Sequence, residues 1–199
     1  MKRVLDIFLS TIITACFLPL GVILIFLIIF ESKGGPFYFQ QRVGLNGRLF
    51  NLIKFRSMYR DSNEGSQITI GNSDPRITKM GRFIRRFKLD EFPQFINVIK
   101  GDMSIVGPRP EVPFFVEKYT QEQRKILKVR PGITDYASLA YFDENQILAK
   151  AKNPQKAYIE EIMPAKLALN QKYLSNPSFS HDLKIIWLTA KKIIGLSSH

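Results

Sequence analysis

The stretch GRFIRRFKLDEFPQFINVIKGDMSIVGPRP, residues 81–110, combines two adjacent carboxylates with several basic residues and a proline-rich end. Proline fits only the first turn of a helix, so Pro93 predicts that a helix begins beside Asp90 and Glu91 and directs its positive end toward them. Apolar residues then recur at the spacing of one buried helical face: Phe92, Phe95, Ile96 and Ile99. The stretch therefore predicts a carboxylate pair held on a packed helix.

The composition limits the classes of protein and of chemistry. With 199 residues, 45% of them apolar, the chain is long enough for one domain with an appendage. Its formal charge of +12 predicts a polyanionic partner: nucleic acid, an acidic membrane surface or a phosphorylated substrate. Cys16 is the only cysteine, and His181 and His199 are the only histidines, which argues against a disulfide framework, a zinc site and a histidine-based nucleophile system. Acid–base chemistry then falls to carboxylates, lysines or tyrosines.

Residues 4–30 form an apolar run long enough to enter a membrane, since about 20 apolar residues cross a bilayer. Hydropathy alone predicts a single-pass anchor. Basic residues flank both ends, however, with Lys2 and Arg3 before the run and Lys33 after it, so the positive-inside rule places both ends in the cytoplasm. Pro19 removes a backbone hydrogen bond and predicts a break that returns the helix to the same face. The hydroxyls expected to satisfy the freed carbonyl belong to Ser10, Thr11 and Thr14.

A β-hairpin follows the apolar run. Residues 36–42 and 49–58 are rich in aromatic and branched side chains, and Gly44-Leu45-Asn46-Gly47 between them is a strong turn signal. Lys54 and Arg56 alternate with apolar residues in the second strand, so one strand face presents two cations. A solvated strand face is the equal alternative for that pattern.

The rest of the chain predicts an α+β catalytic domain over residues 34–199, preceded by the re-entrant membrane helix over residues 1–33. Residues 60–74 are polar and predict a mobile loop that would suit a lid. The expected elements are an amphipathic helix over 77–87, a short strand over 103–106, and helices over 113–127, 158–174 with Pro164 as a kink or break, and 180–194. Trp187 and nearby lysines suit a membrane interface, and an internal core helix is the equal rival.

Adjacent Asp and Glu without histidines suit a hard cation such as Mg²⁺, with Asp90 and Glu91 as its ligands. The helix end and the nearby cations favour the ionised form of Asp90, which can attack phosphorus. The cations expected to bind a diphosphate are Lys54, Arg56, Arg85, Arg109 and Arg130. A bare Asp-Glu pair more often caps a helix, and no P-loop or Gly-x-Gly-x-x-Gly motif is present. The surrounding cations favour a catalytic role for this pair over helix capping.

Several motifs resemble the monotopic phosphoglycosyl transferases, the bacterial sugar transferases that begin glycan assembly, and in particular their small, minimal members. They are Asp74-Pro75-Arg76-Ile77-Thr78-Lys79, Gly81-Arg82-Phe83-Ile84-Arg85, Leu89-Asp90-Glu91-Phe92-Pro93-Gln94, Asn97-Val98-Ile99-Lys100-Gly101-Asp102-Met103-Ser104, Val106-Gly107-Pro108-Arg109-Pro110 and Val129-Arg130-Pro131-Gly132-Ile133-Thr134. The likeness also covers Gln41-Arg42-Val43-Gly44 and Lys54-Phe55-Arg56-Ser57-Met58, so it spans essentially the whole chain.

The resemblance implies transfer of a phosphosugar from a UDP-sugar to polyprenol (undecaprenyl) phosphate, with release of UMP and with Mg²⁺, through a covalent aspartyl-phosphosugar. Asp90 would be the nucleophile, and Glu91 would position groups, bind metal or handle a proton. Phosphate contacts would come from Lys54, Arg85 and Arg109, with Asn97 and Asp102 supporting the site from behind. The implied setting is the cytoplasmic face of the bacterial inner membrane, monotopic among phospholipids, at the first membrane step of polysaccharide assembly and with downstream glycosyltransferases as possible partners.

Two departures from the family pattern stand out. The family usually has a serine just before the helix-breaking proline, where this chain has Phe17 and Leu18. Many relatives also carry a Gly-Arg pair that contacts the nucleotide sugar, whereas residues 137–144 read ASLAYFDE, so sugar recognition must differ here. Two rivals remain: a membrane-anchored scaffold that binds anionic lipid, and a nucleic-acid binder, which the apolar run and the lack of a known docking motif disfavour. No nucleic-acid partner is therefore expected.

Overall fold

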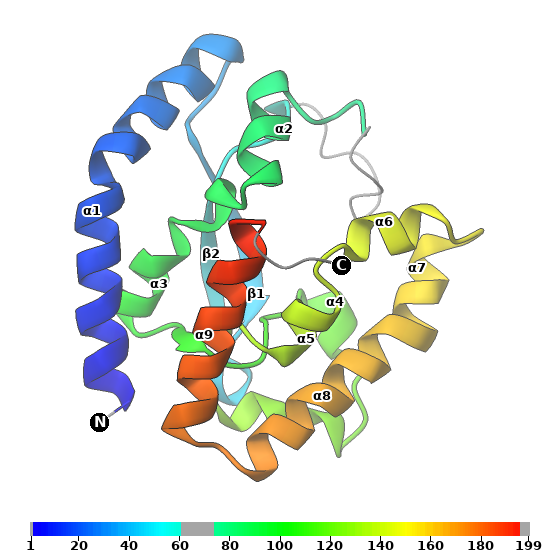
Figure 1. The fold of residues 1–199 in the computed structure, drawn as a ribbon. Coiled ribbons are helices and arrows are strands. Elements are labelled where there is room, and N and C mark those ends of the chain that lie inside the picture. Colours follow the sequence, from blue (N-terminus) through cyan, green and yellow to red (C-terminus); the bar gives the residue numbers. More distant parts are fainter. Residues whose placement is uncertain (1, 61–73, 196–199) are drawn as a thin grey trace.

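The computed structural model describes residues 2–60 and 74–195 and confirms a mixed helix and strand fold with a long apolar N-terminal helix (Figure 1). After α1 (Lys2–Glu31) comes an antiparallel hairpin of β1 (Phe37–Val43) and β2 (Leu49–Phe55). A second, parallel pair joins β3 (Ser104–Val106) to β4 (Gly132–Thr134). The later helices are α2 (Lys79–Arg86), α3 (Gln94–Lys100), α4 (Pro113–Val116), α5 (Tyr136–Ala140), α6 (Glu144–Ala149), α7 (Pro154–Ala157), α8 (Met163–Ser175) and α9 (Phe179–Ile193).

The long helix α1 stays helical through Pro19, and its axis bends part-way along toward α2 (Figure 1). One proline removes one hydrogen bond and leaves the neighbouring turns intact, so a bend does not require the helix to end. The predicted hydroxyls do not fill the gap: Thr11 Oγ1 donates to the Ile7 carbonyl at 2.8 Å, and the hydroxyls of Ser10 and Thr14 have no hydrogen-bond partner among residues 2–60 and 74–195. The predicted break near Pro19 is therefore not confirmed, and the re-entrant path stays a prediction.

Aromatic packing joins α1 to the rest of the molecule beside this bend. The Phe17 ring stacks on the Phe92 ring with centroids 3.9 Å apart, and it lies 6.3 Å from the Phe55 ring of β2. Phe55 belongs to a small core that α1, β2 and α2 share, whose other buried members are Leu24, Ile28 and Ile84. Phe17, one of the two residues found where the resemblance leads us to expect a serine, therefore provides a packing contact and no hydroxyl.

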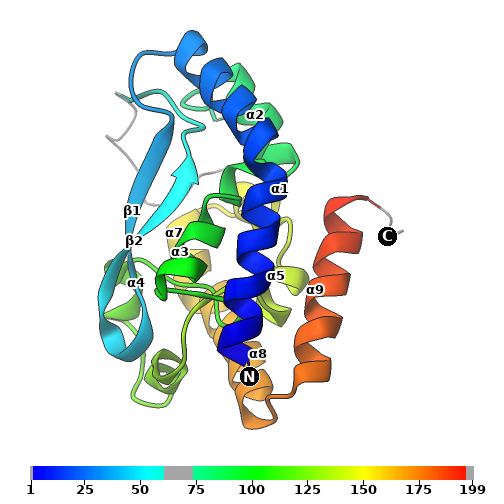
Figure 2. The same ribbon diagram turned by 90° about the vertical axis from the view of Figure 1, so that its left-hand side faces the viewer.

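Both ends of α1 are bonded to the same domain. Near its start, Lys2 forms an ion pair with Asp182 of α9, with N and O 2.7 Å apart. At its end, Glu31 accepts a hydrogen bond of 3.0 Å from the backbone N–H of Met80 in α2, and Arg56 donates to carbonyls of the last turn and beyond. Between these ends the side chains of α1 are mostly exposed, since only 17% of its most apolar window is buried. Figure 2 shows α1 lying along the outside of the domain for its whole length.

The helix α3 buries a different face from the predicted one. Gln94, Asn97 and Val98 are its buried residues, whereas Ile99 is 37% exposed. Asn97 can be buried because its amide is satisfied: Oδ1 accepts from the Ile53 N–H at 3.0 Å and Nδ2 donates to a β2 carbonyl at 2.8 Å. The helix thus turns its polar side toward the hairpin, which apolar spacing alone did not predict.

Two other predicted helices differ from the structure. The helix expected over residues 113–127 is divided into α4 and the 3₁₀ turn η4 (Gln123–Lys128), because Thr120 and Gln123 exchange backbone and side-chain hydrogen bonds that start a new helical turn. Pro164 lies in the first turn of α8, where its missing N–H is harmless, and a π-helical turn, η5 (Tyr158–Ile162), precedes it. Most of the predicted lid lies outside the described residues.

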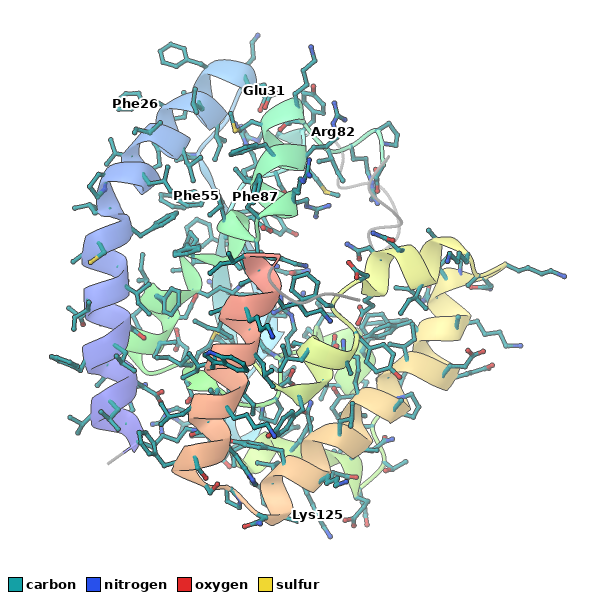
Figure 3. All side chains as sticks on the ribbon, in the orientation of Figure 1. Phe26, Glu31, Phe55, Arg82, Phe87 and Lys125 are labelled. Atoms are coloured by element: carbon teal, nitrogen blue, oxygen red, sulfur yellow. The ribbon has the colours of Figure 1, made fainter. Side chains whose placement is uncertain are left out.

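The last helix, α9, exposes its apolar side chains. Figure 3 shows side chains projecting from the outer surfaces of α1 and α9. On α9, Phe179, Leu183 and Trp187 are 55%, 49% and 61% exposed, and Ile185 faces the core. An internal core helix would bury Trp187, so the interfacial interpretation fits α9 better.

Candidate active site

A short 3₁₀ turn, η3 (Leu89–Glu91), carries the two carboxylates. It follows Lys88, whose backbone is in the left-handed conformation with φ of 56°. This residue turns the chain sharply after α2. Pro93 then precedes the first residue of α3. Asp90 and Glu91 therefore lie on a separate turn just before α3 rather than in its first turn, and the left-handed residue directs that turn into the molecule.

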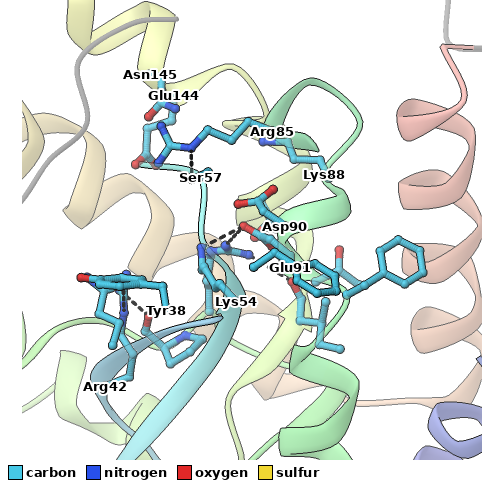
Figure 4. Close-up of a pocket in the computed structure, with 18 of the residues that line it drawn as sticks. Tyr38, Arg42, Lys54, Ser57, Arg85, Lys88, Asp90, Glu91, Glu144 and Asn145 are labelled. Carbon is cyan, nitrogen blue, oxygen red and sulfur yellow. Dashed lines mark hydrogen bonds and ion pairs between the residues drawn. The ribbon is translucent and has the colours of Figure 1, made fainter. Parts of the chain in front are cut away.

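Glu91 forms ion pairs with two cations. Its Oε1 lies 3.3 Å from Lys54 Nζ and accepts a short hydrogen bond from Arg109 Nη2 (Figure 4). Burial alone would raise the pKa of Glu91, but Arg109 and Lys54 hold this pKa well below its usual range. Glu91 is therefore an ionised bridge between the hairpin and the Arg109 loop.

Asp90 differs from its neighbour. Its residue surface is only 7% exposed, and no described side chain or backbone group donates a hydrogen bond to its carboxylate. Burial raises its pKa, as does the charge of Glu91, while Lys54, Arg85 and Lys88 act in the opposite direction. The sequence predicted that nearby cations would lower the pKa of Asp90, but burial has the larger effect and raises it. The result is a carboxylate with unused oxygens at the centre of a ring of cations.

Arg109 is held rigidly in its proline-flanked loop. Its backbone N–H donates to Asp135 Oδ2 at 3.1 Å, and its Nη1 donates to the Ile133 carbonyl at 3.2 Å. Asp135 is fully buried and also accepts from the Ser138 N–H, at the start of α5. Sequence reasoning missed Asp135. Asp135 caps α5, a helix that the sequence analysis did not predict, and only the fold reveals that it also orients the arginine.

Arg85 and Lys88 complete the cations around Asp90. Arg85 Nε donates to Ser57 Oγ at 2.9 Å, just beyond the end of β2. Lys88 Nζ lies 4.8 Å from the centre of the Phe142 ring, and Lys192 of α9 lies 5.0 Å from the same ring. These contacts connect α2, the segment after α5 and α9 around one space.

Asn97 and Asp102 lie behind the site. Asn97 holds the backbone of β2 on either side of Leu52, and Asp102 Oδ2 accepts a hydrogen bond of 3.1 Å from Asn97 Nδ2. Because β2 also carries Lys54, these two residues brace the strand that presents the lysine to Glu91.

Two predicted phosphate ligands, Arg56 and Arg130, form no described hydrogen bond or ion pair with the carboxylates, although Arg56 lines the same cleft as Lys54. Arg56 follows the last residue of β2, and its guanidinium donates to the carbonyls of Ile28, Ser32 and Lys33 at 2.6–3.3 Å. The strand alternation that placed it beside Lys54 ends at Phe55, so its side chain caps the end of α1 instead. Arg130 is exposed and donates to the Gly101 carbonyl at 3.0 Å, away from the carboxylates.

A cleft of about 1730 Å³ contains the carboxylates and their cations. One part of it is apolar and lies between α1 and α9, where it is lined by Leu9, Ile13, Phe95, Ile186 and Ile193. The opposite part is polar and is lined by residues of β1, the Arg109 loop, α6 and α8. The volume exceeds that of an ordinary small-ligand pocket, about 300–1,000 Å³, so two large substrates can be accommodated.

The carboxylates also define a possible cation site. Among the described residues, no group of three or more His, Cys, Asp or Glu side chains could hold a metal. The available oxygens are both of Asp90 and Oε2 of Glu91, since Oε1 faces Lys54 and Arg109. Mg²⁺ commonly binds through one or two carboxylates, with water and substrate phosphate completing its shell, so the pair fits that ion in the presence of a phosphate.

The sequence was compared with known protein families and curated proteins. The family model described as bacterial sugar transferase matches residues 1–195. The chain belongs to this family. Family members are undecaprenyl-phosphate sugar phosphotransferases and are membrane-associated.

Three relatives illustrate the range of the family. The "uncharacterized sugar transferase EpsL" of Bacillus subtilis is 36% identical over 98% of this chain and 87% of its own length. The "galactosyl transferase CpsE" of Streptococcus agalactiae is 38% identical over 87% of this chain, and the "UDP-glucose:undecaprenyl-phosphate glucose-1-phosphate transferase" of Escherichia coli is 35% identical over 96%. The matched regions cover only 38% and 40% of the last two relatives, so these are much longer proteins.

Proposed function

We propose that this bacterial sugar transferase moves a sugar 1-phosphate from a UDP-sugar to undecaprenyl phosphate and releases UMP. The observation that carries the proposal is the contrast between two neighbouring carboxylates: Glu91 is ion-paired with two cations, and Asp90, within the same ring of cations, accepts no hydrogen bond from the described part of the chain. A nucleophile needs an unused oxygen near cations that attract its substrate. The names of relatives, including the E. coli glucose-1-phosphate transferase, support the two substrates.

The transfer proceeds in two displacements at one phosphorus. An Asp90 carboxylate oxygen attacks the β-phosphorus of the UDP-sugar, the bond from that phosphorus to the bridging oxygen breaks, and UMP leaves with the bond's electron pair. A phosphate oxygen of undecaprenyl phosphate then attacks the same phosphorus, which releases the Asp90 carboxylate and forms the lipid diphosphate sugar. Two steps let two anionic substrates use the same cations in turn, which avoids bringing them together.

The cations around Asp90 have distinct tasks in these steps. Lys54 and Arg109 are fixed by Glu91, which keeps both near the reacting phosphorus, and Arg85 is positioned by Ser57. Arginine suits bidentate contact with phosphate oxygens. Asp90 and Glu91 would hold Mg²⁺, whose charge would offset that of the leaving group. Glu91 thus orients the cations, and its free oxygen faces the substrate.

The apolar part of the cleft supports a lipid acceptor. It opens between α1 and α9, whose outer surfaces expose large apolar side chains such as Phe26 and Trp187, at 57% and 61%. An isoprenoid chain lying between these helices would bring its phosphate from the membrane to Asp90. Lysines beside Trp187 suit the headgroup layer, where phospholipids would contact α9.

The attachment of α1 supports a monotopic arrangement on the cytoplasmic face of the cell membrane. Lys2 and Glu31, at opposite ends of the helix, both bond to the catalytic domain. A helix that crossed the bilayer would carry one end about 30 Å away from a domain on the other side. We therefore propose that α1 enters the membrane with its bend near Pro19 and returns to the side from which it came.

The experiment is release of UMP from a panel of UDP-sugars, with undecaprenyl phosphate and Mg²⁺, by the purified full chain in detergent. The wild type should release UMP from at least one sugar nucleotide, and Asp90→Asn should lose at least about a thousandfold in rate, as loss of a nucleophile implies. Glu160→Gln, an exposed carboxylate far along the chain, serves as the matched control. Wild-type activity that Asp90→Asn retains would refute the assignment of the nucleophile.

A further inference from the structure

The polar part of the cleft is a network that the proposed transfer does not use. Its members come from five parts of the chain: Arg42, Glu111, Glu144, Asn145, Tyr158 and Lys166. We refer to these six residues as the far wall. Figure 4 shows three of them, Arg42, Glu144 and Asn145, in the same cleft as Asp90 and Glu91.

The far wall is held together by a chain of contacts. Lys166 Nζ lies 2.7 Å from Glu144 Oε2 and 3.9 Å from Glu111 Oε1, so one ammonium group serves both carboxylates. The Tyr158 hydroxyl donates a short hydrogen bond to Glu111, whose other oxygen lies 3.6 Å from Arg42 Nη1. Such a network keeps each group in a fixed position, which a selective binding surface requires.

Part of the network is unused and faces the cleft. The Glu144 side chain is 26% exposed, and Oε1 of this carboxylate has no described partner. The Asn145 side chain is partly exposed beside it and makes no described hydrogen bond. A purely structural ion network has little need to line a cavity, because burying charges costs free energy that apolar packing avoids. The free acceptor and the free amide therefore point to a ligand.

Only Pro110 separates Arg109, which contacts Glu91, from Glu111 of the far wall. Arg109 holds Glu91, Pro110 follows, and Glu111 belongs to the wall, so one rigid loop serves both places. Arg42 Nη1 donates to the Pro110 carbonyl at 2.9 Å, which fixes the loop from the wall side. Glu144 is near enough to Arg109 to raise the pKa of its guanidinium. A group attached to a phosphorus at Asp90 can thus extend directly onto the far wall.

The charge of the far wall decides what kind of group fits. Its two cations, Arg42 and Lys166, are already paired with Glu111 and Glu144, so the wall offers no excess positive charge to a diphosphate. An isoprenoid chain would leave its polar groups unsatisfied. A hexose ring carries hydroxyls that both donate and accept, which matches a carboxylate oxygen beside an amide.

We propose that the far wall binds the sugar ring of the UDP-sugar and that Glu144 and Asn145 decide which arrangement of ring hydroxyls is accepted. The inference rests on the proposed transfer and adds the site of sugar selection. It also gives a role to residues 141–146, all six of which line the cleft. The nucleoside then occupies a different part of the cleft.

The experiment compares Glu144→Gln and Asn145→Ala with the wild type on UDP-glucose, UDP-galactose and their N-acetylamino counterparts. Glu144→Gln should change the ratio of kcat/KM between the best sugar and its C4 epimer by about tenfold or more, which is the value of a hydrogen bond to a charged group, and Asn145→Ala should change it by about fivefold, the value of a neutral hydrogen bond. Inhibition by UMP should stay unchanged, since UMP carries ribose but not the hexose that is transferred. Melting temperatures would show that both variants fold.

Two control variants remove similar groups outside the far wall. Glu160→Gln and Glu122→Gln each change an exposed carboxylate that is not among the residues lining this cleft. Both should keep the wild-type sugar ratios. An equal fall for all sugars in Glu144→Gln and Asn145→Ala would make the wall merely structural, and weaker UMP inhibition would place the nucleoside there; either result overturns the inference. A wild type inactive on every UDP-sugar would instead refute the transfer itself.

Discussion

At the scale of single residues, Asp90 and Glu91 lie on one short turn but differ in their contacts and in their pKa. Both are largely buried, but only Glu91 has cations in direct contact. The pKa of Glu91 is therefore lowered and the pKa of Asp90 is raised. An ionised Asp90 costs stability that its neighbour does not, which is the expected condition of a group kept for reaction rather than for folding.

This difference predicts opposite effects of neutral substitutions on stability. In EDTA at neutral pH, Asp90→Asn should raise the melting temperature, because it removes a destabilised charge, and Glu91→Gln should lower it by a few degrees, because Lys54 and Arg109 lose their partner. The gain for Asp90→Asn should shrink as the pH falls, since the wild-type Asp90 becomes protonated. Thermal unfolding measures both, with Glu160→Gln as control. Shifts of the same sign for both variants would contradict this account.

The cation site predicts that Mg²⁺ binding depends on the nucleotide. Two carboxylates are too few to complete the shell of Mg²⁺, so the protein alone should bind the ion weakly, and binding should become markedly tighter when UDP supplies phosphate oxygens. Calorimetric titration of Mg²⁺ with and without UDP measures the difference. Glu91→Gln should reduce it, and EDTA should stop UMP release. Equally tight Mg²⁺ binding without any nucleotide would rule out a shared site.

At the scale of elements, α2 must approach the end of β2 very closely to position Arg85. The Thr78 N–H donates to the Ser57 carbonyl at 3.1 Å, and a Cβ on Gly81 would overlap the backbone of Ser57. Ser57 in turn holds Arg85. The glycine is thus required by close approach, because no side chain fits between the helix and the strand end.

The substitution Gly81→Ala should therefore disturb both folding and the site. We expect a melting temperature several degrees lower, at about 2–4 °C for each kcal/mol, and UMP release reduced about tenfold as Arg85 shifts. Gly35→Ala is the matched control, because its Cβ would meet no atom within 4 Å. A Gly81→Ala protein with wild-type stability and activity would show that the close contact is unimportant.

The same elements show how far the sequence predicts the structure. Local patterns correctly placed the hairpin, α2 and the first strand of the parallel pair, because turn chemistry and apolar spacing act over a few residues. Strand alternation correctly placed Lys54 and Arg56 on one cleft, but it could not reveal that carbonyls at the end of α1 bind the Arg56 guanidinium. Asp135 and the far wall depend on contacts between distant segments, which no local pattern encodes.

At the scale of the whole molecule, the attachments of α1 make a prediction about topology. In a Cys16→Ser background, single cysteines at Lys2 and Lys33 should react with impermeant reagents from the same side of the membrane, as should a cysteine at the exposed Lys172 of the catalytic domain. The physical reason is that both ends of α1 are bonded to one domain. Labelling in intact cells and in inverted vesicles measures the sidedness. Opposite sidedness of Lys2 and Lys33 would establish a crossing helix.

The whole arrangement brings two substrates to one nucleophile from different directions. The lipid would enter between α1 and α9, the sugar would lie on the far wall, and Asp90 lines the same cleft as both groups of residues. Such a design requires that the first displacement can occur before the lipid arrives. The covalent intermediate is therefore the central claim.

The most direct test is intact-protein mass spectrometry after mixing the wild type with its UDP-sugar and Mg²⁺ in the absence of undecaprenyl phosphate. We expect a mass increase of one sugar phosphate, mapped to the peptide that contains Asp90, with an equal amount of UMP, and with no increase in Asp90→Asn. The adduct should disappear when undecaprenyl phosphate is added. UMP release that occurs only with the lipid present, without any adduct on the protein, would contradict the account.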